Sequence, residues 1–331
     1  MSALAVSFHG QPLWLWIAFI SLVGVLLALD LGVLNRRSRE IGVRKSVILS
    51  VFYAGLGIAF GAFVWHQLGA RAGIEYLTGF TVEKSLALDN VFVIATIFAF
   101  FAIPQALQHR VLFWGVLGVI VLRAVMIGAG AVLVEQFAWI LYVFAAFLIA
   151  TGVKLLWWGD RPADLSANPV LRFLQGRMRV TDKLHGERFF VRLPAAGGGH
   201  AALHATPLFL ALVLIEVADV IFAVDSIPAI FAITTDPFIV YTSNIFAILG
   251  LRALYFALAA AVHRFIHLKQ ALAVLLVFIG SKIFLADLLG LTKFPAEWSL
   301  AGTVAILASG ILYSLWRSRA GASILERKGD L

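Results

Sequence analysis

Six carboxylates lie within long apolar stretches of this 331-residue sequence. One charge at the centre of a membrane-spanning helix costs about 2.5 to 3.5 kcal/mol, so several together require pairing, protonation or a bound cation. Carboxylate and amide oxygens are the ligands that suit manganese, magnesium and calcium. The sequence therefore predicts an intramembrane site for a divalent cation. The six carboxylates are Asp30, Glu83, Asp89, Glu216, Asp219 and Asp225.

An acidic pattern occurs twice along the chain. In each copy an acid is followed six positions later by an aspartate and then directly by a small polar residue. An arginine and then a Gly-x-Lys pattern come later in each copy. Repeats of this kind are typical of secondary transporters, whose sites lie where matching helices meet. The matched residues are Glu83, Asp89 and Asn90 with Asp219, Asp225 and Ser226, then Arg123 with Arg252 and Lys154 with Lys282.

Helix geometry limits how these acids can meet. Glu216 and Asp219 are three residues apart, which places them on one helix face. The two acids of each pattern are six residues apart, so on a straight helix they point about 120° away from each other. We expect local unwinding near Asp89 and Asp225. Pro228 removes a backbone hydrogen bond, and Asn90 and Ser226 can compete for backbone groups. The freed carbonyls and the asparagine amide would then complete an oxygen-rich cage.

A second interpretation is that the acids only neutralise intramembrane bases. Buried ion pairs contribute little net stability, which argues against so many charges in lipid without another role. A mixed arrangement also fits, in which Arg123 and Arg252 hold carboxylates. Lys154 or Lys282 would then replace the cation in one state. The five bases are Lys84, Arg123, Lys154, Arg252 and Lys282.

Membrane helices are the elements that must position these residues. The chain is 62% hydrophobic and only 13% charged, whereas soluble domains have about 25% charged residues. About 20 apolar residues cross a bilayer as a helix. We predict an all-α bundle of about nine transmembrane helices, with the first one retained. The predicted spans are 12–34, 46–68, 76–103, 111–134, 137–158, 205–233, 239–262, 271–291 and 300–316.

The basic residues set the predicted orientation. Nineteen of the 26 lysines and arginines fall in alternate loops, at 36–45, 110, 161–192, 264–269 and 317–328. The positive-inside rule then places the amino terminus outside and the carboxyl terminus in the cytoplasm. This pattern explains the net charge of +8 without a nucleic-acid partner.

Several classes of chemistry have no support in the sequence. Without cysteine the chain forms no disulfide, thiolate metal site or cysteine nucleophile. No phosphate-binding loop, nucleophile elbow or zinc-protease signature is present, so we expect no enzyme and no resident cofactor.

The polar segment 159–204 divides the chain into three parts. Residues 1–158 hold five predicted spans and a first three-helix repeat at 76–158. Residues 205–331 hold four spans, a second repeat at 205–291 and a cytoplasmic tail. An odd number of crossings in each repeat makes the two repeats inverted. Residues 159–204 are predicted to be a basic cytoplasmic loop. A short amphipathic helix on the membrane surface near 170–184 is the alternative.

The sequence resembles the TerC family of integral membrane proteins over nearly its whole length, and especially its Alx-like members. The resemblance is carried by LALDLGVLNRRSREIGVRKS at 27–46, EKSLALDNVFV at 83–93, IEVADVIFAVDSIPAIFAIT at 215–234, SNIFAILGLRALYFAL at 243–258 and VFIGSKIF at 277–284. The family's acidic motif residues match Glu83, Asp89, Glu216, Asp219 and Asp225, and Asn90 and Ser226 also fit the pattern.

The resemblance implies a manganese exporter of the bacterial inner membrane, with an inverted-repeat architecture related to that of LysE-type transporters. Some family members are tied to tellurium resistance or to alkaline pH. An acidic site repels tellurite by Coulomb interaction, so a cation is the consistent cargo. The expected partners are the lipid bilayer, the divalent cation and protons as the coupling ion. The alternative function is a membrane scaffold for secretion or insertion machinery or for the tellurium stress response, with structural acids.

Overall fold

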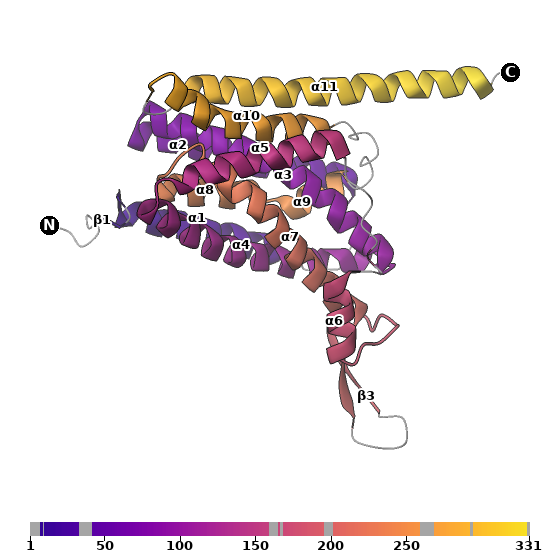
Figure 1. The fold of residues 1–331 in the computed structure, drawn as a ribbon. Coiled ribbons are helices and arrows are strands. Elements are labelled where there is room, and N and C mark those ends of the chain that lie inside the picture. The colour runs from indigo at the N-terminus through magenta and orange to yellow at the C-terminus, as the bar shows by residue number, and fades with distance from the viewer. Residues whose placement is uncertain are drawn as a thin grey trace.

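The structure is a computed structural model that describes residues 7–8, 10–32, 42–158, 165, 168–194, 201–258, 268–291 and 294–329. Almost all of this is helix (Figure 1), as the sequence predicts. The helices are α1 (Leu13–Gly32), α2 (Val43–Leu68), α3 (Ala70–Phe100), α4 (Gln105–Gln136), α5 (Ile140–Trp158), α6 (Pro169–Arg177), α7 (Pro207–Phe231), α8 (Pro237–Ile248), α9 (Leu251–Leu258), α10 (Leu268–Leu288) and α11 (Ala296–Gly329). The strands are β1 (Ser7–Phe8), β2 (Gln11–Pro12), β3 (Phe190–Leu193) and β4 (Ala202–Ala205).

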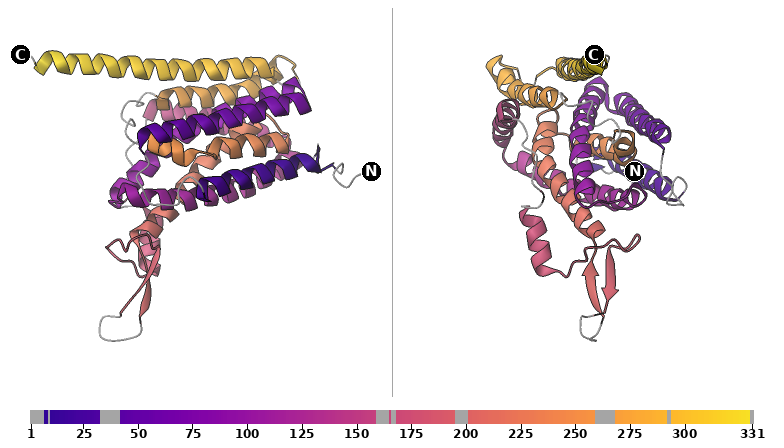
Figure 2. Two further views of the ribbon diagram at one scale, coloured as in Figure 1. Left: turned by 180° about the vertical axis from the view of Figure 1, so that it is seen from behind. Right: turned by 90° about the vertical axis from the view of Figure 1, so that its right-hand side faces the viewer.

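The long helices lie side by side in one bundle (Figures 1 and 2), so their shared direction marks the membrane normal. The hairpin β1–β2 lies at one end of the bundle and the end of α11 at the other. Seven helical segments within the described residues are long and apolar enough to cross a membrane. The chain is therefore a polytopic helical membrane protein. The count of nine crossings stays a prediction. Helix α1 offers only a shorter apolar stretch, Leu13–Leu29, and α3 is not among the seven segments.

The two halves of the chain pack against each other reciprocally. Helix α3 packs on α8 while α4 packs on α7, and α5 packs along α10. The α5–α10 contact is close because glycines face it from both sides. A Cβ at Gly152 would lie 2.6 Å from the Ala273 carbonyl oxygen, and a Cβ at Gly280 would lie 2.6 Å from that of Ala145. Small residues let membrane helices approach in this way.

Aromatic side chains fill the core between α1, α2, α3 and α8. The rings of Phe60 and Phe246 have centroids 4.5 Å apart, and Trp16 meets Phe238 edge-on at 5.2 Å. Such pairs contribute beyond the area that they bury. This core fixes α3 and α8 against each other and so positions the polar residues that they carry.

The predicted unwinding of the acidic helices is wrong. Helix α3 runs unbroken through Asp89, and α7 runs unbroken through Asp225 and past Pro228. An apolar surrounding offers backbone groups no other partners, so the helical hydrogen bonds persist. The break lies instead at Leu249–Gly250, between α8 and α9, where Gly250 has φ +84°. It interrupts the predicted span 239–262.

The predicted loop 159–204 contains regular structure, namely α6, β3 and β4. Asn168 caps α6 by accepting from the backbone N–H groups of Val170 and Leu171, at 2.9 and 3.3 Å. Strands β3 and β4 form an antiparallel ribbon beyond it. A short helix is therefore present near the predicted position, but it begins at Pro169 and ends at Arg177, and its place on the membrane surface stays a prediction.

Candidate functional site

Arg123 lies at the centre of a buried polar cluster formed by four helices. Its side chain is on α4 and is 2% exposed. The guanidinium donates to the Glu83 carboxylate of α3. It donates twice to Asp219 of α7, at 3.0 and 3.2 Å, and more weakly to Ser226 at 3.2 Å and to Asn244 of α8 at 3.4 Å. We call these five residues the Arg123 cluster.

The Arg123 cluster joins the two halves of the chain. Glu83 comes from the first acidic pattern and Asp219 from the second, and both are buried. The planar guanidinium matches the paired oxygens of a carboxylate, which gives the Asp219 contact its two parallel bonds. One positive charge faces two acids, so the cluster has net charge −1 when both acids are ionised. Such a site retains an attraction for additional positive charge.

Two oxygens beside the Arg123 cluster have no hydrogen-bond partner. Asn90 donates its amide to Asp219 at 3.4 Å, but its own Oδ1 is buried and unpartnered. The Oε2 of Glu216 is also buried without a partner, and this carboxylate lies against Gly118, where a Cβ would overlap it. A buried polar group left unsatisfied costs about 1–3 kcal/mol. Both oxygens have unused capacity to bind a proton donor or a cation.

A small cavity adjoins Asn90 and Asp219. It has a volume of about 20 Å³ and is lined by Asn90, Asp219 and apolar residues of α3, α4, α7 and α9. This volume suffices for about one water-sized particle.

The other predicted ligands are not all brought to this place. Asp225 lies near Thr151 and Lys154 of α5, and the Lys154 side chain is exposed. The side chains of Asp30 and Asp89 lie outside the described residues. Among the side chains that are described, no three of His, Cys, Asp or Glu come together to hold a metal ion. In this structure Glu83 and Asp219 are held together by hydrogen bonds from Arg123 and do not form a closed cage of carboxylates.

The matched bases occupy different surroundings. Arg252 is buried and lines a narrow cavity with Tyr53 and Leu249 on the side of α1 and α2. Lys282 is 4% exposed and donates to Ser299 of α11 at 2.8 Å. Arg123, by contrast, donates to two of the predicted acids, Glu83 and Asp219.

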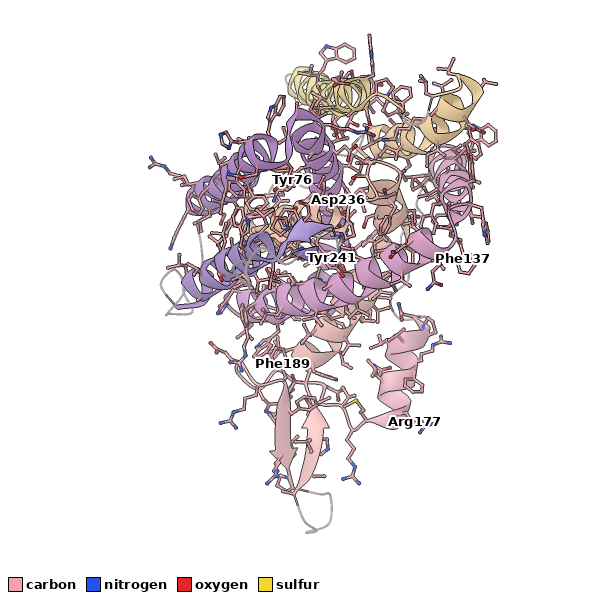
Figure 3. All side chains as sticks on the ribbon, turned by 90° about the vertical axis from the view of Figure 1, so that its left-hand side faces the viewer. Tyr76, Phe137, Arg177, Phe189, Asp236 and Tyr241 are labelled. Atoms are coloured by element: carbon pink, nitrogen blue, oxygen red, sulfur yellow. The ribbon has the colours of Figure 1, made fainter. Side chains whose placement is uncertain are left out.

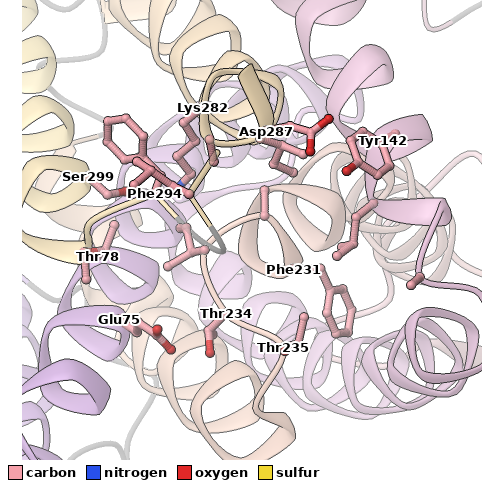
Figure 4. Close-up of a pocket in the computed structure, with 18 of the residues that line it drawn as sticks. Glu75, Thr78, Tyr142, Phe231, Thr234, Thr235, Lys282, Asp287, Phe294 and Ser299 are labelled. Carbon is pink, nitrogen blue, oxygen red and sulfur yellow. Dashed lines mark hydrogen bonds between the residues drawn. The ribbon is translucent and has the colours of Figure 1, made fainter. Parts of the chain in front are cut away.

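A larger cavity of about 420 Å³ lies at the bundle end opposite α6, between α3, α10, α11 and the end of α7 (Figure 4). Thr78 lines it and lies five residues before Glu83 on α3, about 7.5 Å along the helix. Phe231 lines it and lies five residues after Ser226 on α7. The Arg123 cluster therefore separates the large cavity from the small one. Other polar lining residues are Glu75, Thr234, Lys282, Asp287 and Ser299.

Lys84 joins α3 to the broken helix. Its ammonium donates to the carbonyl oxygens of Ala247 at 3.0 Å and Leu249 at 3.5 Å. The last carbonyls of a helix lack intrahelical partners and carry partial negative charge, so a lysine there stabilises the end of α8. Glu83 and its neighbour Lys84 thus have different partners: Glu83 binds Arg123 of α4, and Lys84 binds the end of α8.

Sequence reasoning missed several residues that the structure brings to these places. Asn244 was detectable, because it ends the polar run 242–244 in an apolar stretch. Glu75 is buried at 7% exposure and was missed because it lies one residue before the predicted span. Nothing in the sequence around Gly118 or Thr151 marks them, because each matters only through an acid on α7 that lies against it.

The comparisons with known proteins agree with this architecture. The model of a family described as "Integral membrane protein TerC family" matches residues 68–322. An "Uncharacterized membrane protein" of Rickettsia bellii is 46% identical over 302 residues, which cover 91% of this chain and 97% of the relative. A protein of Photorhabdus laumondii named "Putative membrane-bound redox modulator Alx" is 46% identical over 323 residues, 95% of this chain and 98% of the relative. Its namesake in Escherichia coli K12 is 46% identical over 316 residues, 93% and 95%. No solved structure matches the chain.

Proposed function

The chain belongs to the TerC family of integral membrane proteins, and from this premise we propose that it is a secondary transporter of a divalent cation. We propose manganese as the cargo, export across the bacterial inner membrane as the direction and alternating access as the mechanism. The cation would be held by the acidic residues of the two halves, with Asn90 as a neutral ligand.

One observation carries the proposal: a buried Asn90 oxygen without a hydrogen-bond partner lies beside Asp219, and Glu216, three residues earlier on α7, has a second such oxygen. Hard divalent cations take several oxygen ligands, including carboxylates and amide carbonyls. Unused oxygens next to an acid are the donors that such an ion requires. The donor set fits manganese, magnesium or calcium and lacks the thiolates that softer ions prefer.

Arg123 supplies the proposed switch. It now occupies the carboxylates of Glu83 and Asp219, which a cation would otherwise bind. Cation and guanidinium compete for the same oxygens, so loading the site displaces Arg123 from at least one acid. When the cation leaves, Arg123 rebinds and prevents two bare carboxylates from facing each other in a medium of low dielectric constant.

The separation of the two cavities supports alternating access. The small cavity and the large cavity lie on opposite sides of the Arg123 cluster, so movement of the cluster can connect the site to one side at a time. The reciprocal packing of α3 on α8 and α4 on α7 supports the proposed inverted repeat. The hairpin β1–β2 and the end of α11 lie at opposite ends of the bundle, which supports an odd number of crossings. Protons are the proposed coupling ion.

A flux assay with the purified protein in sealed vesicles tests the proposal. Manganese, calcium, magnesium and zinc are compared at two pH values, with and without a proton gradient. Manganese flux is expected, and Asp219→Asn should lower it at least tenfold, since the variant removes an ionised ligand. Glu135→Gln is the control, because Glu135 is an exposed carboxylate at the end of α4. Equal flux in wild type and Asp219→Asn would remove the assigned site.

The second candidate function is a membrane scaffold, favoured by the helix α6 and the ribbon β3–β4 that lie between α5 and α7. In that case the acids only neutralise Arg123. Deleting 169–194 discriminates, because a transporter retains some metal flux whereas a scaffold loses its association with secretion or insertion machinery. Relatives are named redox modulators. This chain has no cysteine, so any such effect proceeds without thiol exchange of its own.

A further inference from the structure

The segment between α5 and α7 forms an arm that leaves the bundle sideways. We define the arm as residues 168–194 and 201–206, which contain α6, β3 and β4. In Figures 1 and 2 it stands roughly at right angles to the long helices. Figure 3 looks along the bundle, and there Arg177 lies outside the outline of the helices. Because the helices follow the membrane normal, the arm runs along the membrane surface.

Packing at the base fixes the direction of the arm. Leu171 is 3% exposed and belongs to the same apolar cluster as Leu208 of α7. Arg110 of α4 binds Glu187 at 2.9 Å and lies 5.4 Å over the ring of Phe189. The arm is therefore a docked element with a defined orientation, and one of its sides must face the lipid headgroups.

The charge of the arm is strongly positive. Six of its basic side chains are exposed, whereas its only acids within the described residues are Asp182 and Glu187, and Arg110 already binds Glu187. Anionic lipids attract clusters of this kind at the cytoplasmic leaflet. The basic residues are Arg172, Arg177, Arg179, Lys183, Arg188 and Arg192.

Apolar side chains are interleaved with these bases. Phe173 is 62% exposed, Phe190 39% and Leu203 59%. Arg192 pairs directly with Leu203 across the ribbon, and Phe190 lies two residues before Arg192, so the three share one face. Basic and apolar residues on one exposed surface are typical of elements that lie in the membrane interface.

A hollow on the arm combines both kinds of side chain. Its volume is about 360 Å³, and Arg177, Arg179, Phe190 and Leu203 line it. Guanidinium groups bind phosphate oxygens through pairs of N–H donors. Phe190 and Leu203 offer adjoining surface to the glycerol and upper acyl region of the same molecule.

We propose that the arm is a membrane-docking element whose arginines bind the phosphate groups of anionic phospholipids beside the bundle. The arm, the hollow and the shared face of Phe190, Arg192 and Leu203 together form the binding surface. This role is independent of the cation site, since the arm shares no residue with the Arg123 cluster.

A single fluorophore tests the proposal. The chain has no cysteine, so Leu203→Cys in the full-length protein takes one environment-sensitive dye. The labelled protein is placed in nanodiscs of phosphatidylcholine, alone or mixed with phosphatidylglycerol, without metal. We expect emission at shorter wavelength and stronger quenching by spin-labelled lipid in the anionic discs. High salt should reverse both effects, because it screens exposed charges.

The triple variant Arg177→Gln/Arg179→Gln/Arg192→Gln, carrying the same dye, should weaken the preference for anionic lipid by on the order of a hundredfold. Arg44→Gln/Lys45→Gln is the control, because it removes exposed bases at the start of α2 and should leave the dye unchanged. Water-exposed emission in both discs would overturn the proposal and leave the arm as a surface for a soluble acidic protein. A triple variant with unchanged lipid dependence would also overturn it.

Discussion

The two helical segments that carry Leu-Arg-Ala differ in continuity. Helix α4 runs unbroken through Arg123, whereas the chain breaks at Leu249–Gly250 just before Arg252. Gly250 matches Val121 in the other copy. A positive φ at Gly250 permits the break, and Lys84 stabilises the carbonyls that it exposes.

This difference teaches that similar motifs produce different environments through a few residues outside the motif. Lys84 follows the first acid, whereas Val220 follows the matching Asp219. Lys84 therefore binds the end of α8 in the opposite half, and the second acidic pattern has no lysine at the matching position. Arg123 donates to Asp219, and Arg252 lines a cavity beside α1 and α2.

The largest expected effect comes from removing the base on the unbroken side. Arg123→Met leaves Glu83 and Asp219 buried without their cation, which should lower the free energy of unfolding by about 3–5 kcal/mol. Thermal unfolding in detergent measures this, with Arg44→Met as an exposed control. Adding Glu83→Gln and Asp219→Asn should restore part of the loss. A triple variant less stable than Arg123→Met would contradict the ion-pair explanation.

Gly250→Val should have the next largest effect. The valine would adopt φ +84°, and its Cβ would lie 2.6 Å from that of Tyr53. Backbone strain and overpacking together should cost roughly 2–4 kcal/mol in the same unfolding assay. Gly290→Val isolates the strain, because Gly290 has φ +66° and open space around it. An equal loss of unfolding free energy in the two variants would show that the Tyr53 side chain moves aside without cost.

Lys84→Met tests what holds the break in place. The loss of charged hydrogen bonds to Ala247 and Leu249 should cost about 1.5–3 kcal/mol. Amide hydrogen exchange at 247–252 should accelerate, while exchange in α4 stays unchanged. Ser85→Ala is the control, since Ser85 bonds within its own helix to Thr81. Unchanged exchange at 247–252 would mean that the break holds without Lys84.

The smallest effect is expected from copying the glycine into the unbroken helix. Val121 is 63% exposed, so Val121→Gly should cost only the difference in helix propensity, below about 1 kcal/mol. Hydrogen exchange should show α4 still continuous. If α4 instead opened at 121, glycine alone would set the break.

Apolar periodicity and charge predict the helical membrane class because bilayer burial acts on every residue of a span. The acids, Arg123 and Asn90 were identifiable for a similar reason, since polar groups in apolar runs are expensive. The break at Gly250 was placed elsewhere because Pro228 looked like the stronger helix breaker. In the structure Pro228 is accommodated within α7.

Long-range contacts set the rest of the candidate site. Nothing local to Lys84 shows that it reaches Ala247, 163 residues away. Asn244 reaches Arg123 only because aromatic packing holds α8 against its neighbours. The arm was expected to be a loop because its charge dominated the composition, while the cap at Asn168 and the buried Leu171 were not weighed.

The glycines between α5 and α10 restrict how the bundle can rearrange. Gly152 and Gly280 press each backbone against the other, and sliding would force neighbouring side chains into space that only hydrogen can occupy. Helices α5 and α10 must therefore move together as one rigid body. This pair can still shift as a unit against α7 and α3, which it also contacts.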